Sequence, residues 1–274
     1  MLQIPVIDFP KPWVLFSAMM TLSLAYLAFA LIRKWMGWNR GIADDRVGPD
    51  HASRRPIMIW VSEVLLQRQV YALSFSRWAV HMLIFYGFIG LVLLYPVDAI
   101  LKLSGLLALS DTMPRYYLEP TGYIIMKTWG DLFGLMLLCG LVLAGVRRLV
   151  TRPDQQRNDQ ADLLLLVLLI LITTTGFVLE GLRLALAPSE IASYSFVAQF
   201  LAPSGTITAN ALKTWLTACW TFHAVLVASL IVYLPHSKLM HSLLAPVVIG
   251  MNAADEQART DLYWPNVKKY RPTR

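Results

Sequence analysis

Apolar runs and charged segments alternate along the chain. Five of the apolar runs are free of charged residues, or nearly so, and approach the roughly 20 residues that a helix needs to cross a bilayer. In lipid such runs must be helical, because a helix pairs its own backbone polar groups. The pattern therefore predicts an all-α fold, an integral membrane bundle of five transmembrane helices at about residues 13–32, 78–97, 125–146, 163–182 and 214–234.

Composition excludes a soluble globular protein. Hydrophobic residues make up 57% of the 274 residues and charged residues only 15%, with a mean hydropathy of +0.54. Soluble domains instead contain about 45–50% apolar and about 25% charged residues. The two cysteines, Cys139 and Cys219, stand alone in separate apolar runs. They are too few for a zinc site or an iron–sulfur cluster that is held by cysteines.

The lysines and arginines divide unevenly between the two ends of the predicted helices. Eighteen of the 24 fall in the loop after the first helix, in the loop after the third and in the tail, and six fall on the opposite side. The positive-inside rule places the N-terminus outside and the C-terminus in the cytoplasm. The net charge of +7 then reflects topology and predicts no nucleic-acid partner. Residues 1–250 are expected to form the membrane domain, and residues 251–274 a cytoplasmic tail.

The first cytoplasmic loop contains an amphipathic stretch. Residues 57–70, IMIWVSEVLLQRQV, place apolar residues at helical spacing with the charged residues opposite. Such a stretch is typical of a helix that lies in the membrane interface. It also suits a docking surface for a soluble partner, and the two interpretations are compatible.

Histidines are the main candidates for chemistry, because an ionisable group inside a membrane is costly to bury without a partner. His223 and His241 are 18 residues apart, which is five whole turns and about 27 Å if the last helix stays straight. His81 and His241 lie near the cytoplasmic ends of antiparallel helices, and therefore at a shared depth. Two histidines at one level of a helical bundle are suited to binding a haem iron. The alternative for each is a hydrogen bond to a neighbouring helix.

Four stretches resemble a known family. They are HMLIFYGF from His81, GDLFGLMLLCGLVLAGVRRL from Gly130, TGFVLEGLRLA from Thr175 and LPHSKLMHSLLAP from Leu234. Together they resemble the membrane cytochrome b family of the respiratory nitrate reductase gamma subunit. Within it the chain is most similar to the membrane subunit of the Dsr sulfur-metabolism transmembrane complex and to the heterodisulfide reductase membrane cytochromes.

The resemblance implies b-type haem and its ligands. It assigns His81 and His241 to a haem near the cytoplasm and His223 to a second haem near the outer face. The chain departs from the nitrate reductase pattern at Leu91, where that pattern has a second histidine. One haem or two are therefore both compatible with the sequence, with Met126 and Lys127 as weak candidates for the missing ligand.

The expected function is electron transfer in the bacterial inner membrane. The resemblance implies exchange of electrons between the quinone pool and a cytoplasmic, heterodisulfide-reductase-like iron–sulfur subunit in sulfur metabolism. Further membrane and periplasmic cytochrome subunits are expected partners. The competing interpretation is a cofactor-free membrane anchor or a transporter subunit, although no broken helix or internal repeat is visible.

Charged residues suggest two further sites. Glu180 and Arg183 lie three residues apart on one helical face near the outer side, and with Lys127 they are candidates for the quinone site. Glu180 is suited to accept the protons of a quinol, or it simply pairs with Arg183. Arg147 and Arg148 are candidates to bind haem propionates, or they anchor the topology.

Overall fold

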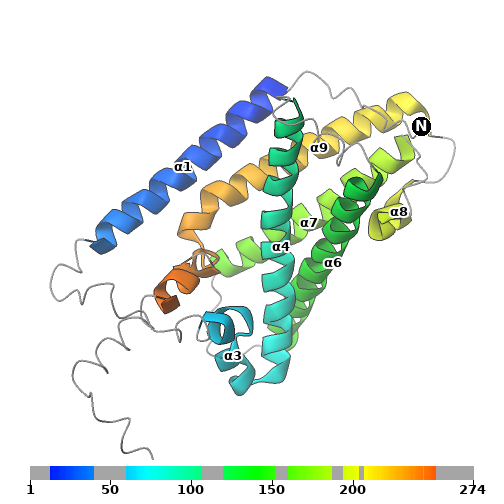
Figure 1. Ribbon diagram of the computed structural model, residues 1–274. Coiled ribbons are helices and arrows are strands. Elements are labelled where there is room, and N and C mark those ends of the chain that lie inside the picture. Colours follow the sequence, from blue (N-terminus) through cyan, green and yellow to red (C-terminus); the bar gives the residue numbers. More distant parts are fainter. Residues whose placement is uncertain are drawn as a thin grey trace, which may run out of the picture. The chain divides into compact units, whose positions relative to one another are not determined.

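The computed structural model describes residues 13–39, 60–106, 120–151, 160–186, 194–203, 207–242 and 244–250. Helices and short turns make up these residues, and no strand occurs among them. Five helices are long and apolar enough to cross a membrane (Figure 1), which confirms the predicted all-α fold with five spans. They are α1 (Trp13–Asn39), α4 (Phe75–Leu106), α6 (Pro120–Thr151), α7 (Gln160–Leu186) and α9 (Ala209–Tyr233).

Shorter elements connect the spans, and the chain divides into two compact units. The first unit contains residues 1–24 and 79–233, and the second contains residues 25–78 and 234–274. The short elements are the π-helix η2 (Val61–Leu65), α3 (Arg68–Leu73), α8 (Phe196–Leu201) and the 3-10 turn η4 (Leu234–His236). The predicted tail 251–274 lies outside the described residues.

The spanning helices extend beyond the charge-free runs. α6 begins at Pro120 and continues through Lys127 and Asp131 before its apolar part. Both charged side chains have partners in the first unit, as described below, so the helix can continue past them at little cost. α4 likewise continues through Pro96 to Leu106. Charge alone is therefore a poor marker of where these helices end.

Glycines allow α4, α6 and α7 to approach closely within the first unit. A Cβ added at Gly87 of α4 would lie 2.5 Å from the Leu137 backbone nitrogen of α6. One added at Gly134 of α6 would lie 2.7 Å from the Phe177 ring of α7. Small residues at such crossings let membrane helices pack at short range. Leu137 itself is only 2% exposed, so this contact belongs to the core.

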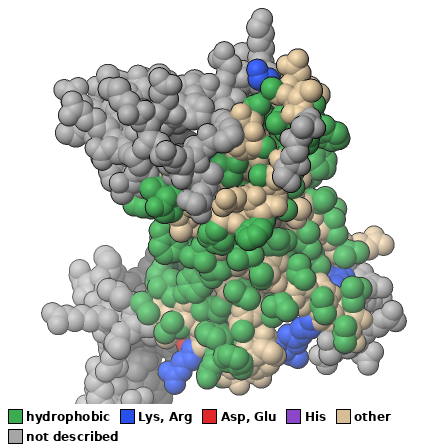
Figure 2. Space-filling view, turned by 90° about the vertical axis from the view of Figure 1, so that its right-hand side faces the viewer, with side chains coloured by type: hydrophobic (Ala, Val, Ile, Leu, Met, Phe, Trp, Pro, Cys, Tyr) green, Lys and Arg blue, Asp and Glu red, His purple; other side chains and the backbone are tan. Residues whose placement is uncertain are grey.

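The described surface is largely apolar. On the face that Figure 2 presents, hydrophobic side chains cover most of the described surface and only a few Lys and Arg side chains interrupt them. Leu22 is 71% exposed, and Leu149 and Val150 of α6 are 77% and 78% exposed. Apolar side chains so exposed suit contact with lipid and not with water.

Two hydrogen bonds join the second half of α1 to η4 in the second unit. The Lys34 ammonium donates to the Pro235 carbonyl at 2.6 Å, and Tyr26 Oη lies 2.7 Å from His236 Nε2. Pro235 is almost completely buried. The turn that ends the last span is therefore fixed by the first span.

The amphipathic stretch 57–70 is not one continuous helix. Its residues 57–59 lie outside the described residues, and the remainder is divided into η2 and α3 at Gln67. Gln67 has φ 49° and ψ 49°, a left-handed conformation that an α-helix cannot contain. The Trp60 indole N–H donates to the Pro246 carbonyl at 3.2 Å, which ties this stretch to the segment after His241.

Candidate functional site

Glu180 is the centre of a polar cluster in the first unit. Its Oε2 accepts from Lys127 Nζ at 2.8 Å and from Arg183 Nε at 2.9 Å, and its Oε1 accepts from Arg183 Nη2 at 2.6 Å. Ser195 Oγ donates to the same Oε1 at 3.3 Å. The side chains of Lys127, Glu180 and Arg183 are 27%, 15% and 18% exposed. The structure thus brings together the three residues that the sequence selected as quinone-site candidates.

The short helix α8 packs beside this cluster, where Figure 1 shows it next to α6 and α7. Asp131 of α6 is 6% exposed, and its Oδ2 accepts the Val197 backbone N–H at 2.8 Å. A Cβ added at Gly181 of α7 would lie 3.0 Å from the Ala198 carbonyl oxygen. The backbone of α8 therefore rests directly on α7, and a carboxylate satisfies one of its unpaired N–H groups.

His223 of α9 is partly buried against α7. Its Nδ1 lies 2.8 Å from Thr175 Oγ1, and the same hydroxyl lies 2.7 Å from the Leu171 carbonyl. The His223 ring also hydrogen-bonds to the Ile172 backbone of the same helix. Two residues of α7 therefore orient this imidazole.

His241 follows the end of α9. The separation of about 27 Å between His223 and His241 is expected only for a straight helix through both, and α9 instead ends at Tyr233, close to the predicted end at residue 234, before the chain turns through η4. Pro235 explains the break, since proline lacks the N–H that would continue the helix. Nδ1 of His241 makes a hydrogen bond with the Lys238 carbonyl. A carbonyl only accepts, so Nδ1 of His241 is the donor in this bond.

The donor set fits a haem. A metal-bound histidine typically donates its other ring N–H to a backbone carbonyl or another fixed acceptor, which sets the tautomer and the ring orientation. Nδ1 of His241 has this arrangement with a carbonyl, and Nδ1 of His223 is hydrogen-bonded to the Thr175 hydroxyl. Imidazoles oriented in this way are suited to be axial ligands of a haem iron. Within the described ranges, no three His, Cys, Asp or Glu side chains gather into a group that could hold a metal ion.

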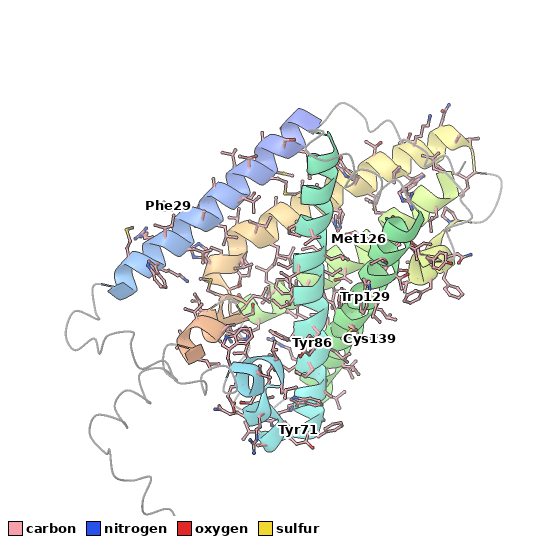
Figure 3. The ribbon with its side chains drawn as sticks, viewed as in Figure 1. Phe29, Tyr71, Tyr86, Met126, Trp129 and Cys139 are labelled. Carbon is pink, nitrogen blue, oxygen red and sulfur yellow. The ribbon has the colours of Figure 1, made fainter. Side chains whose placement is uncertain are left out.

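The remaining sequence candidates occupy two helices. His81 and, ten residues later, Leu91 lie on α4 and are partly buried. Arg147 and Arg148 are partly buried near the end of α6. Met126 is on the same helix as Lys127, near Trp129 (Figure 3).

Several residues of these sites were missed by sequence reasoning. Thr175 belongs to the run Thr173–Thr175 in an apolar span, and threonines there usually bond to their own helix. Asp131 lies inside the predicted span 125–146 but was not selected as a site residue. Ser195 and α8 lie between the predicted spans 163–182 and 214–234, where no element was predicted. Helical phase would have placed Thr175 and its neighbour Gly176 on adjoining faces of their helix. It does not indicate which other helix packs against those faces.

Known proteins resemble the chain over most of its length. Residues 57–249 match the HdrE family, a subunit of dihydromethanophenazine:CoB--CoM heterodisulfide reductase. The corresponding protein of Methanosarcina acetivorans is 26% identical over 236 residues, which are 84% of this chain and 76% of the relative. That of Methanosarcina thermophila is 27% identical over 213 residues, covering 75% and 70%.

A relative with a different name is also similar. The EtfAB:quinone oxidoreductase of Syntrophomonas wolfei is 23% identical over 247 residues, which are 85% of this chain but 32% of that protein. No solved structure matches the chain significantly.

Proposed function

Because the chain belongs to the HdrE family of heterodisulfide reductase subunits, we propose that it is a haem b membrane subunit for electron transfer. It passes electrons between the quinone pool and a cytoplasmic, heterodisulfide-reductase-like iron–sulfur partner in sulfur metabolism. Its relatives support this role, since their names give them as a subunit of a heterodisulfide reductase or as a quinone oxidoreductase. The five apolar spans support a multi-pass membrane protein.

His81 and His241 are the proposed axial ligands of a haem near the cytoplasm, and His223 is the proposed ligand of a haem near the outer face. Bound haem iron takes up and releases one electron at a time. The chain contributes the imidazoles and the hydrogen bonds that orient them. Arg147 and Arg148 are the proposed partners of the propionates, because guanidinium groups pair well with carboxylates.

The observation that carries the proposal is the match of residues 57–249 to the HdrE family. We expect the purified protein in detergent to contain b-type haem with a low-spin spectrum, measured as a pyridine haemochrome and as a reduced-minus-oxidised difference spectrum. A protein reconstituted with excess haem that binds none would contradict the proposal. That result would favour a cofactor-free anchor or a transporter subunit.

The Glu180 cluster is the proposed quinone site. The two oxygens of Glu180 together already accept from two cations, Lys127 and Arg183. We therefore assign Glu180 to hold the cluster together, and Lys127, the most exposed of the three, to contact the carrier. Lys127→Met should weaken carrier binding about tenfold, the effect of losing one hydrogen bond from a charged donor. Lys213→Met, which changes an exposed lysine at the start of α9, is the matched control. Equal affinity in the two variants would remove Lys127 from the site.

The proposed topology has the N-terminus outside and the C-terminus in the cytoplasm of a bacterial inner membrane. It is supported by the unequal distribution of lysine and arginine. A reporter fused after Arg274 should be active only in the cytoplasm. Activity in the periplasm would show that every helix runs in the opposite direction to the one proposed. The surface proposed for the iron–sulfur partner would then face away from the cytoplasm.

A further inference from the structure

Gln67 has two unusual features at once. The residue is 8% exposed, and its amide oxygen Oε1 has no hydrogen-bond partner among the described residues. Its backbone is left-handed, with φ 49° and ψ 49°, and no other non-glycine residue in the described ranges has a positive φ. Buried unpaired polar atoms and strained backbone are both uncommon, and both are candidates for a functional role.

The chain around Gln67 is held on both sides. Val61–Leu65 before it forms the π-helix η2, and such single-turn π-helices occur frequently at functional sites. The Leu66 carbonyl accepts from the Trp78 indole N–H at 2.8 Å. The Gln67 carbonyl accepts the Tyr71 N–H at 3.1 Å. These bonds fix the backbone of the strained residue. Among the described residues, no donor reaches its buried amide oxygen.

The same segment exposes a large apolar surface. Leu66 and Tyr71 are 55% and 54% exposed, and Leu73 and Phe75 are 79% and 66% exposed. Figure 3 shows Tyr71 on α3, and its ring centroid lies 5.3 Å from that of Trp78. An apolar, aromatic surface at the start of a membrane span suits the bilayer interface. A ligand that reaches Gln67 from this surface needs an apolar body and a polar head.

We propose that the Gln67 amide binds the headgroup of a lipid-soluble ring carrier, of the class shared by quinones and phenazines, whose two ring heteroatoms gain hydrogens on reduction. The reduced ring has O–H or N–H donors, for which Oε1 is the acceptor. The oxidised ring has oxygen or nitrogen acceptors, for which the amide NH₂ is the donor after a half-turn of the amide. This site rests on the proposed carrier-linked function, but none of its residues belongs to the Lys127–Glu180 cluster.

Photolabelling tests the proposal on the full chain in lipid nanodiscs. An azido-naphthoquinone should label the peptide that contains residues 60–78. Gln67→Gly removes the amide and suits the left-handed backbone, so the protein should fold and the labelling should fall about tenfold. Gln67→Asn retains an amide in a residue type that tolerates this conformation and should retain more label. Gln69→Ala, a change at an exposed glutamine two residues away, should leave labelling unchanged.

Two results would overturn the site. They are a wild-type protein without label in residues 60–78, and a Gln67→Gly protein that is labelled as strongly as the wild type. Neither depends on haem, whereas the proposed function fails if the protein binds no haem. Loss of label in the peptide that contains Lys127, with label in residues 60–78 intact, would place the failure in the Lys127–Glu180 cluster alone.

Discussion

His223 and His241 are oriented by different neighbours. Nδ1 of His223 is hydrogen-bonded to a side chain of another span, Thr175 of α7, at 2.8 Å. The Nδ1–H of His241 is held by the carbonyl of Lys238, three residues earlier in the same turn. One ring therefore depends on the packing of two helices, and the other depends on a local turn.

The difference determines which remote residues can disturb each imidazole. Movement of α7 against α9 would change the hydrogen bond of His223 directly. His241 would be disturbed instead by loosening of η4, which Lys34 and Tyr26 of α1 hold in place. The first span thus has a specific role in the second unit, although it lies outside residues 57–249, the part that matches the family.

Removal of a proposed ligand should have the largest effect. His241→Ala should abolish one low-spin haem signal, since no imidazole would replace it, and His81→Ala should abolish the same signal. His223→Ala should remove a different signal and lower the haem content, measured as haem per chain. If the haem content is one and His223→Ala leaves it unchanged, His223 is a packing or carrier-site residue.

Addition of a histidine ligand beside the haem proposed at His223 should have the next largest effect. Leu91 occupies the position where a second histidine of α4 is expected, about 15 Å along the helix from His81. The haem at His223 should therefore be partly high-spin and should bind carbon monoxide, while the His81–His241 haem should not. Leu91→His should shift the first haem toward low-spin and should suppress carbon monoxide binding. An unchanged spectrum in this variant would argue against a haem at His223.

The sequence was sufficient for the five spans, because unbroken apolar runs in lipid have only one common solution. It also selected Lys127, Glu180 and Arg183, which the structure joins in one cluster. It did not yield the hydrogen-bond partners of the two imidazoles, because Thr175 and the Lys238 carbonyl become partners only through packing and through the turn after Pro235. The conformation of Gln67 could not be predicted either, because a glutamine in an amphipathic stretch gives no sign of a left-handed backbone.

Loosening of the turn before His241 should have a moderate effect. Lys34→Met removes a cation from a carbonyl at the end of the last span, where such a charge contributes about 0.3–1 kcal/mol. The thermal midpoint should fall by a few degrees, and the midpoint potential of the His241 haem should shift while the His223 haem is unaffected. Arg33→Met, at the neighbouring exposed cation, is the control. A shift of both potentials by the same amount in both variants would mean a general charge effect.

Loss of the Thr175 hydroxyl tests the other half of the comparison. Thr175→Val keeps the size of the side chain but removes the hydroxyl that is hydrogen-bonded to Nδ1 of His223, while the bond of the ring to the Ile172 backbone remains. Loss of such a supporting bond typically weakens a metal site 10- to 100-fold, so the haem at His223 should dissociate faster, while the His241 haem should not. Thr175→Ser restores the hydroxyl and should restore retention, and Thr174→Val changes an exposed neighbour as a control. If Thr175→Val and Thr174→Val lose haem at the same rate, the orientation of His223 does not depend on α7, and the contrast between the two histidines is absent.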